Sequence, residues 1–239
     1  MSKVLPLIKP SINVINNNRL CRFKTNSLLG ELIVSSGPNF ETPSFNLTEI
    51  IDKNGNKLGF ENYNIDRLNS VITGFCIEIE KNYRNCGAKL GEILRLASII
   101  NMMENKVERF EIISKPEAMY FHSKYKFTPA IKQFVLRDEI LNWIITSKSD
   151  AVKSFLLEAH KIQESVANSG NDVFLKRELC VKTNELLDKI INIVVQDKKL
   201  QEENPFKTCV NLVLTKEKVL KNKDYFNELF NSHGIDYQI

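Results

Sequence analysis

The segment between residues 71 and 133 constrains the fold more than any other part of the chain. Residues 71–80 end in alternating isoleucines and glutamates, a period of two that predicts a half-buried strand. Residues 88–105 place apolar side chains at spacings of three and four, which predicts a helix. Patterns for a strand (110–114), a helix (116–125) and a strand (127–133) follow. This alternation of strand and helix predicts an α/β fold with a mixed sheet flanked by helices.

The loop between the first of these strands and the long helix is basic. It carries Lys81, Arg84 and Lys89, and Gly87 lies just before the helix. Backbone N–H groups at the start of a helix attract phosphate, and the helix dipole adds to this attraction. A glycine allows the backbone to approach an anion closely, because it has no Cβ. The loop is therefore a candidate phosphate-binding loop, and the alternative is a solvated basic turn.

Two motifs in this segment resemble the GNAT family of N-acetyltransferases. Residues 77–87 read IEIEKNYRNCG and resemble the family's central strand and pyrophosphate loop. Residues 115–127 read KPEAMYFHSKYKF and resemble the family pattern Asn-x-x-Ala-x-x-Phe-Tyr-x-Lys-x-Gly-Phe. Four residues agree with that second pattern, namely Ala118, Phe121, Lys124 and Phe127. One helix and one strand separate the two motifs, and the resemblance covers residues 45–133.

The chain also departs from the family pattern. Lys89 stands at the second glycine of the loop in the simplest register, which Gly91 replaces only if the loop is shifted. His122 stands at the common tyrosine, and Lys126 at the glycine before the last phenylalanine. The sequence shows no equivalent of the two helices that follow the family's first strand and help to shape the acceptor site. These departures fit a divergent enzyme or a GNAT-like fold that has lost catalysis.

The resemblance implies an N-acetyltransferase, a transferase that uses acetyl-CoA as co-substrate and acts on an amine. The amine attacks the acetyl thioester directly, a base removes the ammonium proton, and an acid protonates the leaving thiolate. Backbone N–H groups of the central strand polarise the thioester carbonyl. The residues that the resemblance assigns to cofactor binding are Ile77, Ile79, Arg84, Asn85, Cys86, Gly87, Ala88 and Lys89.

Four side chains are candidates for proton transfer. Glu78 and Glu80 share one face of the strand and are the candidate bases. His122 is the candidate acid, since an imidazolium donates a proton near neutral pH, and Tyr120 is the second choice. The alternatives are a solvated strand face or pairing with lysine for the glutamates, and surface or core packing for His122 and Tyr120. Cys76 and Cys86 lack the ligand pattern of a zinc site, so no metal is expected.

The sequence predicts that the whole chain is divided into three regions. Residues 1–19, with two prolines and an asparagine run, are expected to form an irregular arm. Residues 20–135 are expected to form the GNAT-like domain, with strands at 20–24 and 30–35 and a hairpin of 45–52 and 57–65 turning at Asn54-Gly55.

Residues 136–239 are expected to form a mostly helical extension, with helices at 137–146, 150–167, 172–199 and 224–232. Short apolar runs at 209–214 and 235–239 are expected to be strands, and in one version of the fold they return to the sheet. The helices at 137–200 are then an insertion and not a separate domain. The extension also offers a surface for a homodimer or for another protein partner.

Charge and composition narrow the partners. The net charge is +4, from 33 basic and 29 acidic residues, which is too small an excess to indicate a nucleic-acid-binding protein. No apolar run reaches the roughly 18 residues of a membrane-spanning helix, and no signal peptide is recognised. We therefore expect a cytoplasmic protein. The resemblance to the GNAT family implies that it binds acyl-CoA and an amine acceptor of unknown identity. The rival hypothesis is a GNAT-like binding or interaction module without catalysis.

Overall fold

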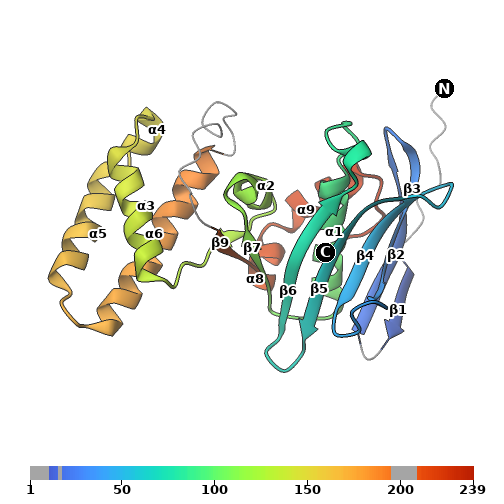
Figure 1. Ribbon diagram of the computed structural model, residues 1–239, viewed down its shortest axis with the longest axis horizontal. Helices are drawn as coiled ribbons and strands as arrows, with labels where there is room; N and C mark the ends of the chain where they lie inside the picture. Colours follow the sequence, from blue (N-terminus) through green and yellow to red (C-terminus); the bar gives the residue numbers. More distant parts are fainter. Residues whose placement is uncertain (1–10, 16–17, 195–208) are drawn as a thin grey trace. The chain divides into compact units, whose positions relative to one another are not determined.

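The computed structural model describes residues 11–15, 18–194 and 209–239 (Figure 1). The strands of this described part form one sheet, in the order β1-β2-β3-β4-β5-β6-β7-β9-β8. The chain divides into two compact units, of which the first comprises residues 1–111 and 215–239 and the second residues 112–214. The expected α/β class, a mixed sheet flanked by helices with a helical C-terminal region, is confirmed. The expected domain boundary at residue 135 stays a prediction.

Six antiparallel strands make up the sheet of the first unit. They are β1 (Ser11–Ile15), β2 (Asn18–Ser27), β3 (Gly30–Pro38), β4 (Asn46–Asp52), β5 (Lys57–Asp66) and β6 (Val71–Ile79). The expected strands and the hairpin of β4 and β5 are confirmed, and Gly55 in its turn has a φ of 85°. Strand β1 corrects the expectation of an irregular arm at residues 11–15, while residues 1–10 and 16–17 of that arm lie outside the described residues. The strand β7 (Arg109–Ser114) runs across the boundary between the units.

One face of this sheet is covered by helices. Helix α1 (Leu90–Glu104) contacts β2, β4, β5 and β6, and its apolar side chains are buried as its spacing predicts. The short helix η1 (Lys81–Tyr83) precedes α1, while α8 (Lys216–Lys221) and α9 (Lys223–Ser232) follow β9 in the sequence. Along β4 and β5, buried residues alternate with half-buried ones, as expected for a sheet with one covered face.

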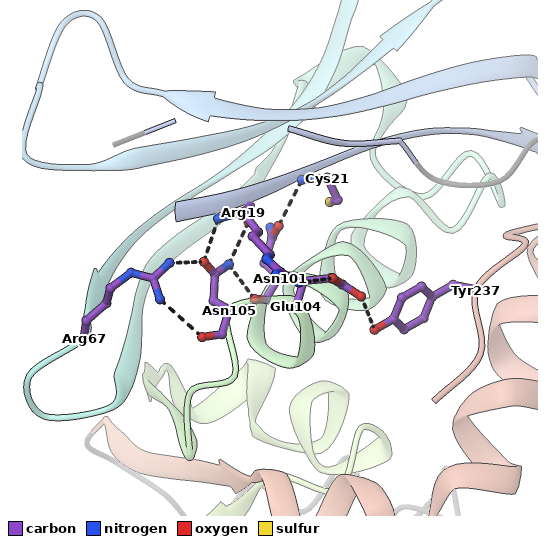
Figure 2. A network of polar contacts seen from close by, with 7 residues as sticks. All are labelled: Arg19, Cys21, Arg67, Asn101, Glu104, Asn105 and Tyr237. Atoms are coloured by element: carbon purple, nitrogen blue, oxygen red, sulfur yellow. Dashed lines mark hydrogen bonds and ion pairs between the residues drawn. The ribbon is translucent and has the colours of Figure 1, made fainter. Parts of the chain in front are cut away.

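Asn101 of α1 and Asn105, the residue that follows its last turn, tie this helix to β2 (Figure 2). The side-chain oxygen of Asn101 accepts a hydrogen bond from the backbone N–H of Cys21 at 3.3 Å. Asn105 accepts from the N–H of Arg19 at 2.8 Å and donates to its carbonyl at 2.7 Å. Arg67 donates to the side-chain oxygen of Asn105 at 2.8 Å. Because these bonds satisfy buried or partly buried polar groups, they hold α1 in one position on the sheet.

The second unit consists of helices and short strands. It contains the 3₁₀ turn η2 (Pro116–Ala118), α2 (Met119–Lys124), β8 (Thr128–Pro129), α3 (Phe134–Thr146), α4 (Asp150–Lys153), α5 (Leu156–Asn168), α6 (Val173–Val194) and β9 (Val210–Thr215). Helices α3, α5 and α6 pack against one another (Figure 1). Asn184 of α6 bonds both backbone groups of Ile131, at 2.9 and 3.2 Å, and so joins this bundle to the segment after β8.

The outcome for the two expected C-terminal strands is mixed. Strand β9 is present and pairs with β8, so the helices from α3 to α6 lie in the sequence between two paired strands. The expected strand at 235–239 is wrong. There the hydroxyl of Tyr237 donates to Glu104 of α1 at 3.1 Å, and the N–H of Ile239 donates to Asn227 of α9 at 2.9 Å. Residues 235–239 therefore form hydrogen bonds with side chains of helices, whereas a strand would form them with the backbone of a neighbouring strand. Residues 195–199 of the helix expected at 172–199 lie outside the described residues.

None of the helices that the structure describes has both the length and the apolar character needed to cross a lipid bilayer.

Candidate functional site

The C-terminal end of β6 presents two different faces. Ile77 pairs with Glu61, whose carboxylate contacts Arg95 of α1, so Ile77 lies on the face that α1 covers. Glu78 pairs with Phe60 and therefore points to the opposite, open face. Glu80 follows the last residue of β6, with φ −53° and ψ 137°, and its side chain is exposed. Both candidate bases are therefore exposed.

A β-bulge interrupts β6 before its acidic end. Asn62 of β5 pairs with Cys76, but the next residue, Tyr63, pairs with Gly74, so Phe75 is the extra residue. Bulges bend a strand, increase its twist and are common beside active sites. The Phe75 ring is half exposed and contacts the ring of Phe45 edge to face at a centroid distance of 4.8 Å. The bulge therefore leaves an aromatic side chain at the surface three residues before Glu78.

The loop after β6 has a positive backbone φ at every second residue from 85 to 89. Asn85, Gly87 and Lys89 have φ values of 59°, 78° and 53°, so every second residue is left-handed. Left-handed residues in a turn expose backbone N–H groups, which are donors suited to an anion. Asparagine and glycine tolerate this conformation, but for lysine it costs about 1–2 kcal/mol. Strain of this kind is typical of ligand-binding loops.

The loop leads directly into the start of α1. Lys89 is the N-cap residue, and no side chain caps the first turn of the helix. The carbonyl of Lys89 accepts from the N–H groups of Glu92 and Ile93 at 2.9 and 3.1 Å. A helix start of this kind offers its first N–H groups to an anion. The left-handed Lys89 supports the simplest register of the resemblance, in which this position belongs to the second glycine of the loop.

Arg84 connects the loop to the candidate base. Its Nε donates to the backbone carbonyl of Ile79 at 2.7 Å, and its Nη2 lies 3.5 Å from Oε1 of Glu78. Both side chains are about half exposed, at 55% for Arg84 and 54% for Glu78. Lys81, Asn85, Cys86 and Lys89 are exposed, while Ala88 is buried beneath the loop. Glu78 therefore pairs with a cation, as the alternative from the sequence expects, but with an arginine and not a lysine.

The two candidate acids belong to the second unit and are described there. His122 and Tyr120 lie on α2, and both side chains are buried. The His122 ring lies edge to face with Phe121 and Phe127, at centroid distances of 5.0 and 6.0 Å. The packing alternative is therefore realised for both residues, and their role in proton transfer stays a prediction.

The end of α2 explains one departure from the family pattern. Lys126 follows the helix with a φ of 64°, and its N–H donates to the carbonyl of Ser123 at 3.0 Å. This is a left-handed helix C-terminus, a position that usually holds glycine. Lys89 and Lys126 both stand where the pattern has glycine, and both keep the backbone conformation that glycine favours.

The strain at Lys89 is measurable by comparing two substitutions. Both Lys89→Gly and Lys89→Ala remove the charge, but only glycine adopts a positive φ without strain. We expect Lys89→Gly to be more stable than Lys89→Ala by about 1 kcal/mol in urea denaturation. Lys81 in η1 lacks a positive φ, so there alanine is expected to be the more stable substitution by about 0.5–1 kcal/mol. The same order at both positions would contradict the left-handed assignment.

Two residues near the loop carry no sequence motif. A Cβ on Gly59 would lie 2.8 Å from the carbonyl oxygen of Glu78, so only glycine allows β5 to approach the end of β6 this closely. Leu28, in the turn between β2 and β3, lies beside the loop, since a Cβ on Gly87 would be 3.2 Å from its Cδ1. The isolated glycine in a strand pattern is a signal for such a close approach. Leu28 has no such signal, because 59 residues separate it from Gly87.

In the residues that the structure describes, no three His, Cys, Asp or Glu side chains gather as metal ligands do. Cys76 and Cys86 are exposed free thiols.

Within the described part, no helix lies between β1 and β6, so the sequence correctly indicated the lack of two helices there. A turn of residues 39–45 joins β3 and β4, and it carries Phe40, which is 90% exposed.

No family model and no curated protein matches the chain. Solved structures do match. Tetrahymena GCN5 shares 13% identity over 38% of this chain and 56% of its own, with a TM-score of 0.35. A GNAT-family acetyltransferase from Staphylococcus aureus shares 20% identity over 37% of this chain and 55% of its own, with a TM-score of 0.33. PaiA N-acetyltransferase from Thermoplasma acidophilum, solved with coenzyme A, shares 13% identity over 36% of this chain and 54% of its own, with a TM-score of 0.30.

The chain spans only about half the length of these three proteins. The features of this chain that bear on its function are a bulged strand, a left-handed basic loop and the uncapped start of α1.

Proposed function

We propose that the protein is an acyl-CoA-dependent N-acyltransferase, with acetyl-CoA as the donor and an amine as the acceptor. The observation that carries the proposal is the loop between β6 and α1. It combines left-handed residues at 85, 87 and 89 with three cations and an uncapped helix start. Backbone donors and cations in this arrangement suit the pyrophosphate of CoA. The resemblance of residues 77–87 and 115–127 to GNAT motifs points to the same ligand.

In the proposed reaction, the amine nitrogen attacks the carbonyl carbon of the thioester. A C–N bond forms, the C–S bond breaks, and the sulfur leaves with the bonding electron pair. Glu78 or Glu80 accepts the proton that the ammonium must lose, and both carboxylates are exposed and so accessible to an acceptor. The resemblance assigns the proton of the leaving thiolate to His122 or Tyr120. Backbone N–H groups of the strand around Ile77 and Ile79 stabilise the oxyanion.

The rival proposal is a binding module that keeps the CoA loop without catalysis. Lys89 and Lys126 are relevant to this rival proposal, because both lysines have the positive φ that glycine favours. Replacement of these glycines is thus no argument for a collapsed loop. A homodimer or protein partner bound through the helices of 136–239 is compatible with both proposals. The cytoplasmic location expected from the sequence stays a prediction.

The proposal is tested by ligand binding and turnover together. At about 100 times its dissociation constant, CoA should stabilise the folded protein by about 2.7 kcal/mol and raise its melting temperature by several degrees. Thiol release from acetyl-CoA is then measured across a panel of small amines and peptides. No stabilisation at millimolar CoA overturns the proposal, whereas stabilisation by CoA without turnover for any amine favours the binding module. Turnover only with longer acyl chains identifies a different donor.

The role of the candidate acid is tested by His122→Ala. We expect it to lower the turnover number by about 10²–10⁴-fold, the usual contribution of a general acid, while the affinity for CoA changes little. His160→Ala on α5 is the matched control and should leave turnover unchanged. Equal turnover in the wild type and His122→Ala would remove His122 from the mechanism and leave Tyr120 as the candidate.

A further inference from the structure

Arg84 holds two groups at the end of β6 at the same time. Its Nε is bound to the backbone carbonyl of Ile79 at 2.7 Å, a short and well-formed hydrogen bond. Its Nη2 reaches Oε1 of Glu78 at 3.5 Å, a longer and looser contact. The backbone of Arg84 is extended, with φ −68° and ψ 137°, and the left-handed part of the loop begins at the next residue. The guanidinium therefore lies between the candidate base and the candidate phosphate loop.

The contact to Glu78 is of the kind that exchanges easily. Ion pairs between half-exposed side chains contribute about 0–1 kcal/mol, because water screens the charges and pairing costs both side chains conformational freedom. A phosphate is a stronger partner for arginine, since two N–H groups bind two of its oxygens at once. A guanidinium has five N–H donors, so the bond from Nε to Ile79 persists while the Nη groups change partner.

Lys57 and Glu49 on the open face are paired with each other and not with Arg84 or Glu78. Lys57 of β5 contacts Glu49 at 2.9 Å and lies over the ring of Phe60, 4.7 Å from its centroid. Phe60 pairs with Glu49 on one side and with Glu78 on the other, so the three side chains form a row across β4, β5 and β6. In this row Glu49 is bound by Lys57, whereas Glu78 is bound by Arg84 from the loop.

We propose that Arg84 is a positioning residue that exchanges the Glu78 carboxylate for a phosphate of CoA. This inference rests on the proposed function, because it takes the loop to be the CoA site. In the free protein Arg84 neutralises Glu78 and reduces its attraction for an ammonium group. When CoA binds, the Nη groups turn to the phosphate and the Nε bond to Ile79 keeps the side chain in place. Glu78 is then released to accept the proton of the acceptor amine, so CoA binding prepares the acceptor side.

Competition for Arg84 makes a specific prediction about CoA affinity. Removing the charge of Glu78 frees the guanidinium beforehand, so Glu78→Gln should bind CoA more tightly. The matched control is Glu80→Gln, which removes the same charge two residues away in the sequence. By isothermal titration at low salt, we expect CoA to bind about two- to fivefold more tightly to Glu78→Gln than to Glu80→Gln. This difference should disappear in an Arg84→Ala background and at about 0.5 M salt.

The outcomes separate this inference from the function on which it rests. If the wild type binds no CoA, the proposed function fails and takes the inference with it. If the wild type binds CoA but both glutamine variants change its affinity equally, only the inference is overturned. A difference that persists without Arg84 also overturns it, because the effect then comes from general charge repulsion. Tightening that needs Glu78 and Arg84 together supports the exchange.

Discussion

Gly87→Trp is expected to weaken CoA binding by on the order of a hundredfold, equivalent to about 2.7 kcal/mol. Gly87 has a φ of 78° in the middle of the left-handed loop, and even a Cβ there would approach Cδ1 of Leu28 to 3.2 Å. An indole at this position must either fill the concavity of the loop or displace the turn that carries Leu28. In both cases the backbone N–H groups lose the arrangement that suits a pyrophosphate. The affinity for CoA is measured by isothermal titration.

Gly55→Trp is the matched control for this prediction. Gly55 also has a positive φ, of 85°, and lies in the exposed turn between β4 and β5 with no atom within 4 Å of a built Cβ. Each tryptophan variant carries the cost of a left-handed residue with a side chain, about 1–2 kcal/mol in the free energy of unfolding. Only Gly87→Trp should lose affinity for CoA. Wild-type affinity in a folded Gly87→Trp variant would place the CoA site elsewhere.

Local patterns were sufficient to predict most elements of the fold. The spacing of apolar residues predicted the helix at 88–105 to within two residues of α1, because that helix buries one broad stripe on the sheet. Asn54-Gly55 predicted the hairpin, because both residues accept the backbone of a tight turn. The alternation in 77–80 also predicted a strand, which continues to Ile79 with Glu78 on its exposed face. In each case the signal lies within a few neighbouring residues.

Features that depend on distant residues were not predictable in this way. The asparagine run and the prolines indicated an irregular N-terminal arm, yet Ser11–Ile15 forms β1 because β2 offers an antiparallel partner. The apolar residues in 235–239 indicated a strand, but Glu104 and Asn227 supply hydrogen bonds there in place of a neighbouring strand. Both errors come from partners that a local pattern does not contain.

The candidate site shows the same division. The basic loop and its glycine are visible in the sequence, and so is the order of strand, loop and helix. The left-handed Lys89 is not, because lysine gives no sign of a positive φ. The contact of Arg84 with Glu78 is likewise a matter of side-chain direction, since the two residues are six apart across the end of a strand. Sequence reasoning therefore located the loop but not the pairing within it.

Glu61 is the residue that local patterns concealed most completely. It is 1% exposed on β5, and its carboxylate lies 3.1 Å from Nη1 of Arg95, which is itself buried on α1. Ser98 also donates to this carboxylate, and the Arg95 guanidinium lies over the ring of Phe110, 5.2 Å from its centroid. The sequence pattern of a strand predicts that a glutamate within it is exposed. The neighbouring residues of Glu61 do not indicate that its partner is an arginine 34 residues away.

Breaking this buried pair is expected to have the largest effect on stability. Arg95→Met leaves the Glu61 carboxylate buried without its cation, which should lower the free energy of unfolding by about 3–5 kcal/mol near neutral pH. Lys24→Met is the matched control, because it breaks an exposed pair with Glu31 of 2.9 Å and should cost about 1 kcal/mol or less. The double variant Glu61→Leu with Arg95→Met should recover much of the loss, because no unpaired charge remains. Urea denaturation measures all of these free energies.

The deficit of Arg95→Met should also depend on pH with a definite sign. Burial raises the pKa of Glu61 above that of an exposed glutamate, while Arg95 and Ser98 oppose this rise. Without Arg95 the pKa rises further, so the carboxyl is protonated in the folded variant at mildly acidic pH. A carboxyl with a raised folded pKa stabilises the fold below its unfolded pKa, and this contribution is lost as the pH rises through the folded pKa.

The free-energy difference between the wild type and Arg95→Met should therefore be smaller at about pH 5 than at about pH 8. A large deficit that is the same at both pH values would show that lost packing against Phe110, and not the stranded carboxylate, dominates the cost. A deficit below about 1 kcal/mol at pH 8 would contradict the buried pair itself. Because Arg95 lies on the helix that begins at the candidate CoA loop, the affinity for CoA should fall only where the folded population falls. Weaker binding in fully folded Arg95→Met would instead connect the buried pair directly to the loop.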